Sequence, residues 1–598
     1  MHELPTFAGP LSLLDLGDEL RTLRDELRAA ATAAEPRIAR LPEDRRPSAR
    51  NLVRYLALRR HDRRDLQRRL ARHGLSSLGR CEGHVLASVE AVLSVVERLE
   101  HREPAPGDPT GIDVDAAEAL LRARADALLG APAAGRDVRI MVTLPSEAAT
   151  DPALVDALVD GGMDCARINC AHDAPEAWAA MAAHVRAAAQ RRGRPCRVLM
   201  DVGGPKLRTG ALPPAEAVLK LRPHRDVFGR VQAPWRAWLG SAPAPAALPA
   251  IELDGAPPAA GATLRLTDAR GAQRRCIVER AGVGGVVVAG ERTAYVVPGT
   301  ELRDDDGVAH AVVAVPERAG HVRLQAGDLL HVIAPGAAPP EDVAWVPCSL
   351  PQVFADVRPG HAVVFDDGRI GGRVVEVDAD RLVVRIRHAA PGGARLRADK
   401  GINLPDSNLH LPALTAEDRE AIPFVARHAD LLGLSFVHRD GDIAQARALL
   451  DAAGGADVGL VLKIETPRAF RRLPELLLAA MALPGPWGVM IARGDLAVEC
   501  GFERLAEVQE EILWLCEAAH TPAIWATQVL EGMAKTGLAS RAEITDAAMG
   551  VRAECVMLNK GPSIVEAMET LDDVLCRMVA HQHKKTALLR RLAPFSAG

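Results

Sequence analysis

The chain has 598 residues, 48% of them hydrophobic and 25% charged, and its 73 basic and 78 acidic residues give a net charge of −5. This composition is typical of folded domains and excludes wholesale disorder, and the near balance of charges excludes a chain-wide polybasic nucleic-acid binder. A chain of this length is expected to hold roughly three or four domains.

No segment predicts a membrane or secretory role. The longest apolar stretch, 476–492, is interrupted by Pro484, Gly485 and Pro486, so it is not expected to span a bilayer as a helix. The first ten residues lack a basic segment followed by an apolar one, so no secretory signal is predicted. The ten cysteines include no CxxC pair, which fits a reducing compartment. We therefore expect a cytoplasmic protein without membrane or nucleic-acid partners.

Residues 1–130 predict a helical domain. Apolar residues recur at helical spacing in 13–32 and 84–102, and 103–111 is rich in Pro and Gly, which indicates a linker. The segment 50–80 is rich in arginine. It is either a patch that binds an anion or nucleic acid, or a solvated helix face relieved by Asp62 and Asp65, and we favour the second interpretation.

From residue 137 onward, short apolar runs recur, each followed by a helical stretch. This pattern is typical of βα units whose strands are buried on both faces, and eight such runs predict an α/β fold, a (β/α)₈ TIM barrel. The barrel would comprise 137–210 and 399–580, close to the roughly 250 residues usual for this fold. The eight runs are 138–144, 165–169, 197–201, 431–436, 459–465, 487–492, 522–527 and 555–559.

The segment 211–398 then predicts a β-rich domain inserted after the third barrel strand, because its apolar runs are short and several alternate with polar residues. Within it, the Pro/Ala-rich stretch 243–250 predicts a surface loop. The glycine-rich stretch 282–290 is interpreted as a turn between strands, not a phosphate-binding loop. Residues 581–598 are predicted to form a C-terminal tail.

Polar residues gather where the predicted strands end, which is where such barrels place their functional groups. Glu465 and Asp495 follow adjacent strands, so they can converge on a hard divalent metal such as Mg²⁺. Arg167, Arg208 and Lys463 could surround a phosphate. The alternative is a set of salt bridges between strand ends, but so many polar ends in one barrel favour a site. They include Arg167, Asn169, His172, Asp201, Ser435, Lys463, Glu465, Arg493, Gly494, Asp495, Thr527, Gln528, Asn559 and Lys560.

Seven motifs in chain order resemble those of pyruvate kinases, and the resemblance covers 137 to about 575. The inserted domain lies where that family has its mobile lid, and FDDGRI (365–370) resembles a lid motif. The motifs are GMDCARINCAHD (162–173), MDVGGPKLRTG (200–210), DKGINLPDSNLHLPALTAEDRE (399–420), LKIET (462–466), VMIARGDLAVE (489–499), WATQVLEGM (525–533) and SRAEITDAAMGV (540–551).

The resemblance implies an enzyme, a phosphotransferase that moves the phosphoryl group of phosphoenolpyruvate to ADP and yields ATP and pyruvate. It implies that Lys463 and Thr527 are catalytic and that Glu465 and Asp495 hold Mg²⁺ or Mn²⁺. The remaining roles also follow from the matched positions. Substrate would be bound by Arg167, Lys463, Gly494, Asp495 and Thr527, and nucleotide by Asn169, His172, Arg208 and Lys400.

The potassium site of the family is altered in this sequence. That site uses an Asn, a Ser, an Asp and a Thr; here Asn169 and Asp201 remain, but Ala171 and Val202 replace the Ser and the Thr. Lys206 stands where the family usually has a Glu. We hypothesise that the Lys206 ammonium, together with Asp201, replaces K⁺, because both cations carry one positive charge. Activity without K⁺ is therefore expected.

Two further departures concern the loop after the last strand and the end of the chain. In LNKGPSIV (558–565), Asn559 and Gly561 replace a Ser and a Glu and Lys560 is new, which leaves the proton path and the role of Lys560 open. Because the chain ends at Gly598, the C-terminal domain of the family is expected to be absent. Its usual subunit interface and sugar-phosphate activation are then not expected, and any oligomer would use another surface.

Three functions are compatible with these features. The first is an active pyruvate kinase. The second is a related barrel lyase acting on phosphoenolpyruvate or pyruvate, which would need neither ADP nor a lid. The third is a non-catalytic phosphoenolpyruvate sensor, suggested by the altered loop at 558–565. We expect the first, because the set Lys463, Glu465, Asp495 and Thr527 is intact.

Overall fold

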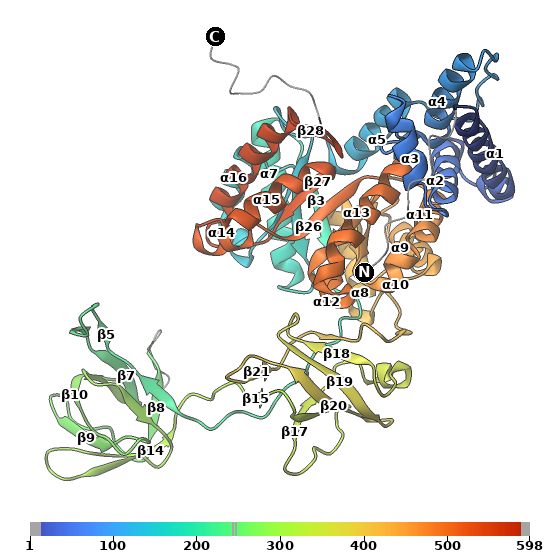
Figure 1. The fold of residues 1–598 in the computed structure, drawn as a ribbon. Coiled ribbons are helices and arrows are strands. Elements are labelled where there is room, and N and C mark those ends of the chain that lie inside the picture. The colour runs from blue at the N-terminus through green and yellow to red at the C-terminus, as the bar shows by residue number, and fades with distance from the viewer. Residues whose placement is uncertain (1–12, 242–243, 246–247, 588–598) are drawn as a thin grey trace. The chain divides into compact units, whose positions relative to one another are not determined.

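The computed structural model describes residues 13–241, 244–245 and 248–587 and divides into two compact units (Figure 1). The first unit comprises the chain up to Lys206 and from Asn403 onward. The second runs from Leu207 to Ile402. Within the described residues, no helix combines the length and the apolar character needed to cross a membrane.

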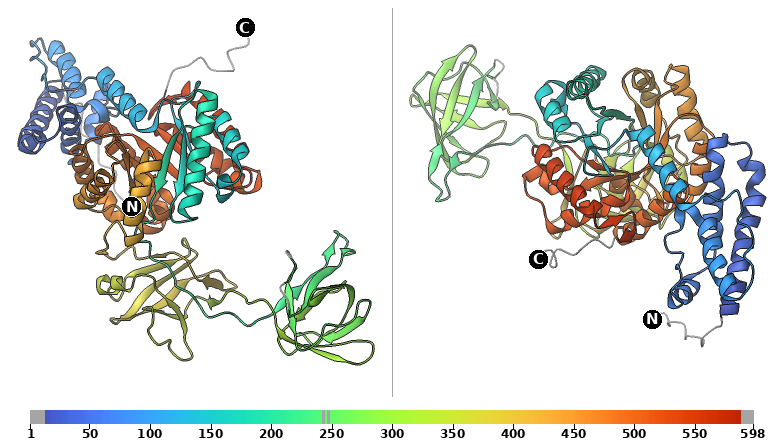
Figure 2. Two further views of the ribbon diagram at one scale, coloured as in Figure 1. Left: turned by 180° about the vertical axis from the view of Figure 1, so that it is seen from behind. Right: turned by 90° about the horizontal axis from the view of Figure 1, so that it is seen from above.

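Eight parallel strands of the first unit close into a barrel, and helices surround it (Figures 1 and 2). This confirms the α/β class and the (β/α)₈ barrel, and each of the eight predicted runs overlaps one strand. The strand order is β1 (Arg139–Thr143), β2 (Cys165–Asn169), β3 (Arg197–Asp201), β23 (Leu431–Leu434), β24 (Gly459–Ile464), β25 (Trp487–Ala492), β26 (Ala523–Val529) and β27 (Cys555–Leu558).

The helices of the barrel follow its strands in the alternation that the sequence predicts. Their apolar faces pack on the outward side chains of the strands, so most strand residues are buried on both sides. They are α6 (Pro152–Asp160), α7 (Pro175–Arg192), α8 (Ala416–His428), α9 (Asp440–Ala452), α10 (Pro467–Arg471), α11 (Leu473–Met481), α12 (Arg493–Cys500), α13 (Phe502–Ala518), α14 (Glu531–Thr536), α15 (Arg541–Met549) and α16 (Ile564–Val579).

The amino-terminal end of the barrel is closed by a helix that precedes it. Leu128 and Leu129, at the end of α5 (Val114–Leu129), belong to the same buried cluster as the inward side chains of the strands. A Cβ atom at Gly488 would lie 2.6 Å from the Leu128 side chain, so glycine at this position leaves room for the end of α5.

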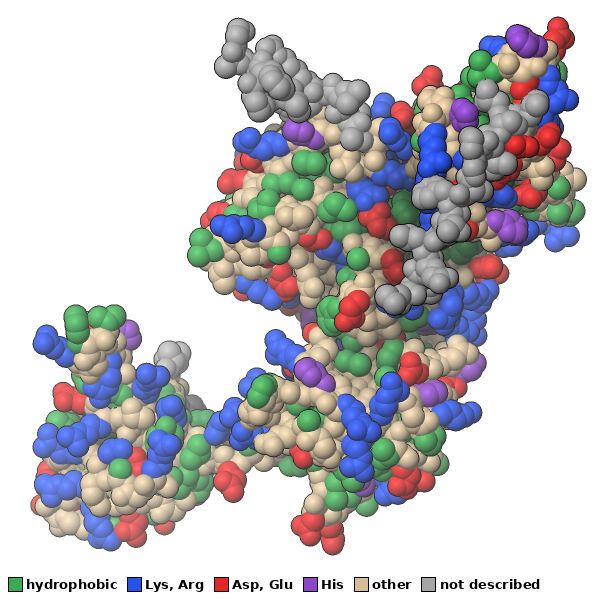
Figure 3. Space-filling view, in the orientation of Figure 1, with side chains coloured by type: hydrophobic (Ala, Val, Ile, Leu, Met, Phe, Trp, Pro, Cys, Tyr) green, Lys and Arg blue, Asp and Glu red, His purple; other side chains and the backbone are tan. Residues whose placement is uncertain are grey.

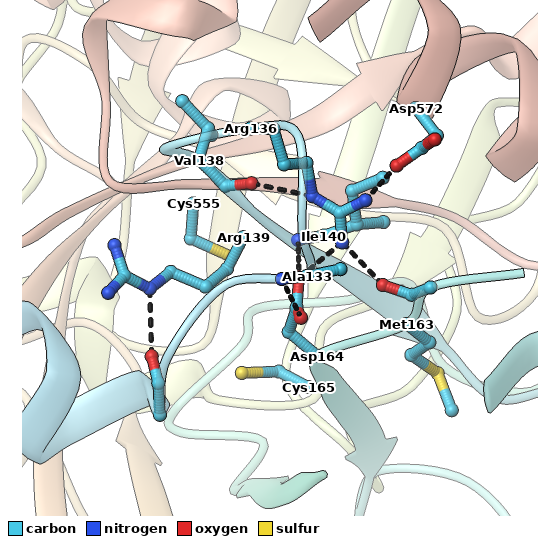
Figure 4. A network of polar contacts seen from close by, with 12 residues as sticks. Ala133, Arg136, Val138, Arg139, Ile140, Met163, Asp164, Cys165, Cys555 and Asp572 are labelled. Atoms are coloured by element: carbon cyan, nitrogen blue, oxygen red, sulfur yellow. Dashed lines mark hydrogen bonds and ion pairs between the residues drawn. The ribbon is translucent and has the colours of Figure 1, made fainter. Parts of the chain in front are cut away.

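A buried polar network holds the segment between α5 and β1 against the barrel (Figure 4). The guanidinium of Arg136 donates to the Asp164 carboxylate at 2.6 Å and to the Val138 carbonyl at 2.8 Å, and it pairs with Asp572 on α16. Asp164 also accepts from the backbone of Ile140 at 2.8 Å. The network fixes where β1 begins.

The remaining helices of the N-terminal part are α1 (Leu13–Ile38), α2 (Arg46–Leu58), α3 (Arg64–Arg72) and α4 (Val85–Leu99). The predicted linker 103–111 lies between α4 and α5. The arginines of 50–80 form ion pairs with acidic residues, as in Arg50–Glu35 and Arg63–Glu26. These ion pairs favour the helix-face interpretation, although Arg54 is buried and lies 3.6 Å from Asp108 and so is not solvated.

A short hairpin after α16 joins the helical part to the barrel. It consists of β28 (Gln582–His583) and β29 (Thr586–Ala587) and lies within the predicted tail, whose residues 588–598 are outside the described part. Lys584 pairs with Glu554 before β27, and Lys585 pairs with Glu82 of the helical part. Burial raises the pKa of the nearby Glu517 to about 7, although Lys584 opposes this shift.

Glu517→Gln is expected to stabilise the protein at pH 8 and to leave it nearly unchanged near pH 4. The folded pKa of about 7 exceeds the ordinary value of 4.5, so the folded state holds a proton that the unfolded state releases, and stability falls as pH rises between these values. The full effect is roughly 3 kcal/mol. Thermal unfolding midpoints at the two pH values measure it. The exposed Glu118→Gln in the same region is the control, and a pH-independent difference would refute the prediction.

The second unit is rich in β-structure. One part is a closed barrel of seven strands, which we call the accessory barrel. Its strand order is β10 (Gln273–Gly282), β11 (Gly285–Gly290), β7 (Trp235–Gly240), β8 (Ala250–Leu253), β14 (Ala309–Ala314), β13 (Glu301–Arg303) and β9 (Thr263–Thr267). The glycine-rich stretch 282–290 was expected to be a turn, but only 283–284 turn the chain: Gly282 ends β10 and pairs with Gly285, and Gly285–Gly290 is β11. The predicted loop 243–250 lies partly outside the described residues.

The other part of the second unit contains a sheet in which five strands follow one another in space. Their order is β17 (Ala344–Pro347), β16 (Leu329–Ile333), β20 (Arg381–His388), β19 (Ile370–Val377) and β18 (Ala362–Phe365). The motif 365–370 forms the turn between β18 and β19. A two-stranded ladder, β15 (His321–Leu324) with β21 (Ala394–Arg397), accompanies the sheet.

Candidate functional site

A buried lysine lies at the centre of the polar cluster at the carboxyl ends of the barrel strands. Lys463, at the end of β24, is 8% exposed. Its Nζ donates to Ser435 Oγ at 2.7 Å and lies 3.0 Å from Glu465 Oε1 and 3.3 Å from Asp201 Oδ1. Burial by itself would lower the pKa of Lys463, but the two carboxylates outweigh it and raise that pKa. The ammonium therefore stays charged within the barrel.

The two predicted metal ligands are close enough to influence each other. Burial raises the pKa of Glu465, Lys463 opposes this, and the like charge of Asp495 adds to the rise. Glu465 Oε2 also accepts from the backbone of Phe436 at 2.7 Å, which orients the carboxylate. Among the described residues, no group of three or more His, Cys, Asp and Glu side chains is arranged around a common metal position. A cation here would have two carboxylates as protein ligands.

Lys206 contacts Asp495 directly. Its Nζ lies 3.0 Å from Oδ1 and 3.1 Å from Oδ2 of that carboxylate. Asp201, which the sequence pairs with Lys206 as the potassium replacement, is instead held by Lys463 and by Arg167, whose Nε donates at 2.9 Å. Burial by itself would raise the pKa of Asp201, but these two cations lower it. The structure thus places the Lys206 charge on a predicted metal ligand.

The end of β26 has an unusual backbone. Thr527 has φ of +67° and Gln528 has φ of +58°, a left-handed conformation that is costly for a β-branched residue. Thr527 Oγ1 accepts from the Gly494 amide at 2.7 Å. Such outliers persist where surrounding contacts over-determine them and are frequent at functional sites. The geometry brings together Thr527 and Gly494, as the sequence predicts.

Arg493 supports this backbone, a role that the sequence analysis did not predict. Its guanidinium donates to the carbonyls of Ala526 at 3.0 Å and Thr527 at 2.7 Å, pairs with Asp546 and lies 4.5 Å from the Trp525 ring centroid. The sequence offered one indication of this role, because Arg493 directly precedes Gly494 and Asp495.

A second unpredicted contact involves Glu499 on α12. Its Oε1 accepts from Asn403 Nδ2 at 2.8 Å, and burial raises its pKa to about 7. Asn403 belongs to the motif 399–420, and Glu499 ends the motif 489–499. The pairing joins two motifs that lie far apart in the sequence.

The four predicted nucleotide-binding residues divide between the two units. Asn169 and His172 belong to the first unit, at and after the end of β2, and the Asn169 side chain accepts from the backbone of Ala171 at 3.1 Å. Arg208 and Lys400 belong to the second. There Lys400 Nζ lies 2.9 Å from Asp366 in the turn between β18 and β19, and Arg208 donates to the Asp399 carbonyl at 3.0 Å.

The loop after β27 packs against α14. The Ser563 amide donates to the Ala534 carbonyl at 2.9 Å, and a Cβ atom at Gly561 would lie 2.2 Å from that same oxygen. A glutamate at position 561 would therefore force this backbone to shift. Lys560 is exposed.

Fold and site together define a (β/α)₈-barrel protein with a lysine–carboxylate cluster at the carboxyl ends of its strands. Residues 304–563 match the family model described as pyruvate kinase, barrel domain. The chain is 34% identical to a pyruvate kinase of Agrobacterium vitis over 276 residues, which is 45% of this chain and 54% of that protein. It is 35% identical to one of Methylorubrum extorquens over 245 residues (40% and 47%) and 34% identical to one of Thermococcus litoralis over 241 residues (38% and 48%).

The matched region of the chain is similar to the barrel domain of pyruvate kinases. It spans about half the length of the curated relatives it matches. The region matched by the family model contains Lys463, Glu465, Asp495 and Thr527, whereas β1, β2 and β3 precede it.

Proposed function

We propose that this protein transfers the phosphoryl group of phosphoenolpyruvate to ADP, giving pyruvate and ATP. The observation that carries the proposal is the buried Lys463, held in its charged form by Asp201 and Glu465 at the carboxyl ends of the strands. Phosphoryl transfer depends mainly on positioning and on fixed charges aimed at the oxygens of the moving group. A preorganised ammonium in a water-poor site supplies such a charge.

In this proposal Lys463 stabilises both the phosphoryl group during its transfer and the enolate that remains. Arg167 binds the phosphate of the substrate, and its orientation is fixed by Asp201 and by Thr143, whose Oγ1 accepts at 3.1 Å. The Gly494 amide and the Thr527 hydroxyl, already hydrogen-bonded to each other at 2.7 Å, bind the substrate carboxylate.

The carboxylates fit the divalent metal that the family implies. Glu465 and Asp495 are like charges close enough to raise the pKa of Glu465, and a cation that both contact would offset this repulsion. Mg²⁺ is commonly bound through one or two carboxylates, with substrate oxygens and water as its other ligands. When bound, Mg²⁺ would neutralise charge on the phosphate oxygens. Mn²⁺ fits the same donor set.

We further propose that the reaction needs no K⁺. Lys206 supplies one positive charge beside Asp495, within the same cluster as Lys463 and Arg167. Ala171 and Val202 lack the side-chain oxygens that a Ser and a Thr at these positions would offer to K⁺. The Lys206 ammonium is part of the chain, so its presence in the site does not depend on the concentration of a monovalent cation. The reaction rate should therefore not respond to monovalent salt beyond general screening.

Lys206→Met is expected to tighten metal binding while lowering kcat. The ammonium contacts both oxygens of Asp495 and therefore competes with a metal for them. Its removal should lower the Mn²⁺ dissociation constant by about tenfold, in keeping with Coulomb interactions of a few kcal/mol near a protein surface. Direct Mn²⁺ binding followed by electron paramagnetic resonance is the measurement. Lys535→Met, which removes an exposed ammonium paired with Glu531, is the control, and unchanged affinity in Lys206→Met would contradict the competition.

The decisive test is pyruvate formation from phosphoenolpyruvate, ADP and Mg²⁺, with and without K⁺. Turnover that requires ADP supports the kinase. Turnover without ADP would replace it by the lyase. Binding of phosphoenolpyruvate without any product would favour the sensor, for which the close packing of Gly561 against the Ala534 backbone is the specific observation.

A further inference from the structure

Three arginines stand side by side on the outer surface of the accessory barrel. Arg275 on β10 is directly opposite Arg265 on β9, and Arg265 is directly opposite Arg303 on β13. We call these three residues the arginine row. Figure 3 shows abundant Lys and Arg side chains over this part of the second unit.

The strand pattern dictates that the row faces outward. Along β9, the buried Leu264 and Leu266 alternate with exposed residues, and along β10 the buried Cys276 and Val278 do the same. The arginines occupy the exposed positions, and the side chains of Arg265 and Arg303 are 70% and 58% exposed. Like charges directly opposite on neighbouring strands destabilise a sheet, so the row carries a cost that a bound anion would offset.

The negative charges within the protein neutralise the row only in part. Arg303 pairs with Glu301 at 2.6 Å, and Arg265 lies 3.7 Å from Asp305, at the limit of an ion pair. For Arg275, no side-chain hydrogen bond or ion pair is found within the described residues.

A groove of about 590 Å³ adjoins the row and contains further positive charge. Arg265, Arg274, Arg275 and Arg292 line it, and Arg292, like Arg275, has no side-chain partner in the described part of the chain. Of the two acidic residues in the lining, Glu279 is already bound by Arg236 through two hydrogen bonds of 2.7 and 2.9 Å, which leaves Glu291. Arg274 is paired with Asp268 at 3.1 Å, so the excess positive charge of the groove comes from Arg275 and Arg292, opposed by Glu291.

We propose that this groove binds a small anion that carries two or more phosphate groups. Guanidinium groups suit phosphate because their planar donors match its oxygens, and neighbouring strands separate the arginines by about 5 Å, so several charges are presented at distinct positions. The volume lies within the range of small-ligand sites. None of the groove residues, all of which the structure describes, is aromatic, so the surface that would stack nucleic-acid bases is missing.

Isothermal titration of the full chain with tripolyphosphate, in low salt and without divalent metal, tests this proposal. The paired variant Arg275→Gln/Arg292→Gln is expected to bind about tenfold more weakly than the wild type, since hydrogen bonds to charged groups are lost. The matched control is Arg280→Gln/Arg387→Gln, which removes the same charge from exposed positions outside the groove and should bind as the wild type does. Any binding in the first unit is common to all three proteins, so their difference reports the groove.

The variants should remain folded, because all four side chains are exposed and the loss of Arg275 relieves a like-charge contact. The melting temperature of the paired variant is expected to equal or exceed that of the wild type. Inorganic phosphate should bind more weakly than tripolyphosphate. Equal affinity of the paired variant and the control, absence of wild-type binding, equal affinity for inorganic phosphate, or tighter binding of a thymidine oligonucleotide would each overturn the proposal. None of these outcomes depends on kinase activity.

Discussion

Lys463→Met is expected to lower kcat by about 10²- to 10³-fold, the loss typical of removing one preorganised charge-stabilising donor. The magnitude follows from the setting of this ammonium, which is 8% exposed and held by Asp201, Glu465 and Ser435. A water-poor environment screens charge weakly, so no solvent ion can replace it. Steady-state pyruvate formation at saturating phosphoenolpyruvate, ADP and Mg²⁺ measures the effect.

Two controls separate lost chemistry from a lost fold. Lys535→Met removes an exposed lysine on α14 and should retain full activity. Lys463→Met also leaves Glu465 without its nearest cation, so a lower melting temperature is expected in addition to the lost activity. A variant that binds phosphoenolpyruvate and retains wild-type kcat would show that Lys463 serves the fold alone.

The combined change Lys206→Glu, Ala171→Ser and Val202→Thr is expected to convert a K⁺-independent rate into one activated at least about tenfold by K⁺. The wild type should react equally fast in potassium and tetramethylammonium salts, because the Lys206 ammonium is part of the chain. The three substitutions remove that charge and restore the two missing oxygen ligands beside Asn169 and Asp201. They also place two carboxylates side by side at 206 and Asp495, a repulsion that a bound cation would relieve.

Rates in the two salts, at matched ionic strength, measure this change. Lys206→Glu alone should be poorly active in both salts, because the charge is lost and the ligand set stays incomplete. Strong activation of the wild type by K⁺ over tetramethylammonium would contradict the assignment of Lys206. An equal rate of the triple variant in both salts would show that these positions do not form a monovalent-cation site.

Some contacts in the site could not be predicted because they join residues far apart in the sequence. Lys206 and Asp495 are separated by 289 positions, and their pairing places a charge on a predicted metal ligand. The sequence places both residues at strand ends. It does not indicate which carboxylate the Lys206 ammonium contacts, because that depends on the path of the loop after β3. The same holds for Glu499 and Asn403, which are 96 positions apart.

Other features depend on strand register. The arginine row exists because β9, β10 and β13 align Arg265, Arg275 and Arg303. Shifting one strand by a single residue would turn its arginine toward the barrel interior, since side chains alternate between faces. Alternation in the sequence indicates that these residues are exposed, but it carries no information on which strands are neighbours.

What the sequence determined by itself is the barrel and the order of polar residues along it. Runs such as 487–492 are apolar throughout because parallel strands are buried on both faces, and the residue types at the strand ends follow directly from chain order. Only the tertiary structure decided the raised pKa of Glu517, the left-handed backbone at Thr527 and the contact of the Lys206 ammonium with Asp495. These properties arise from desolvation and from contacts between distant segments, and they exist only once the chain has packed.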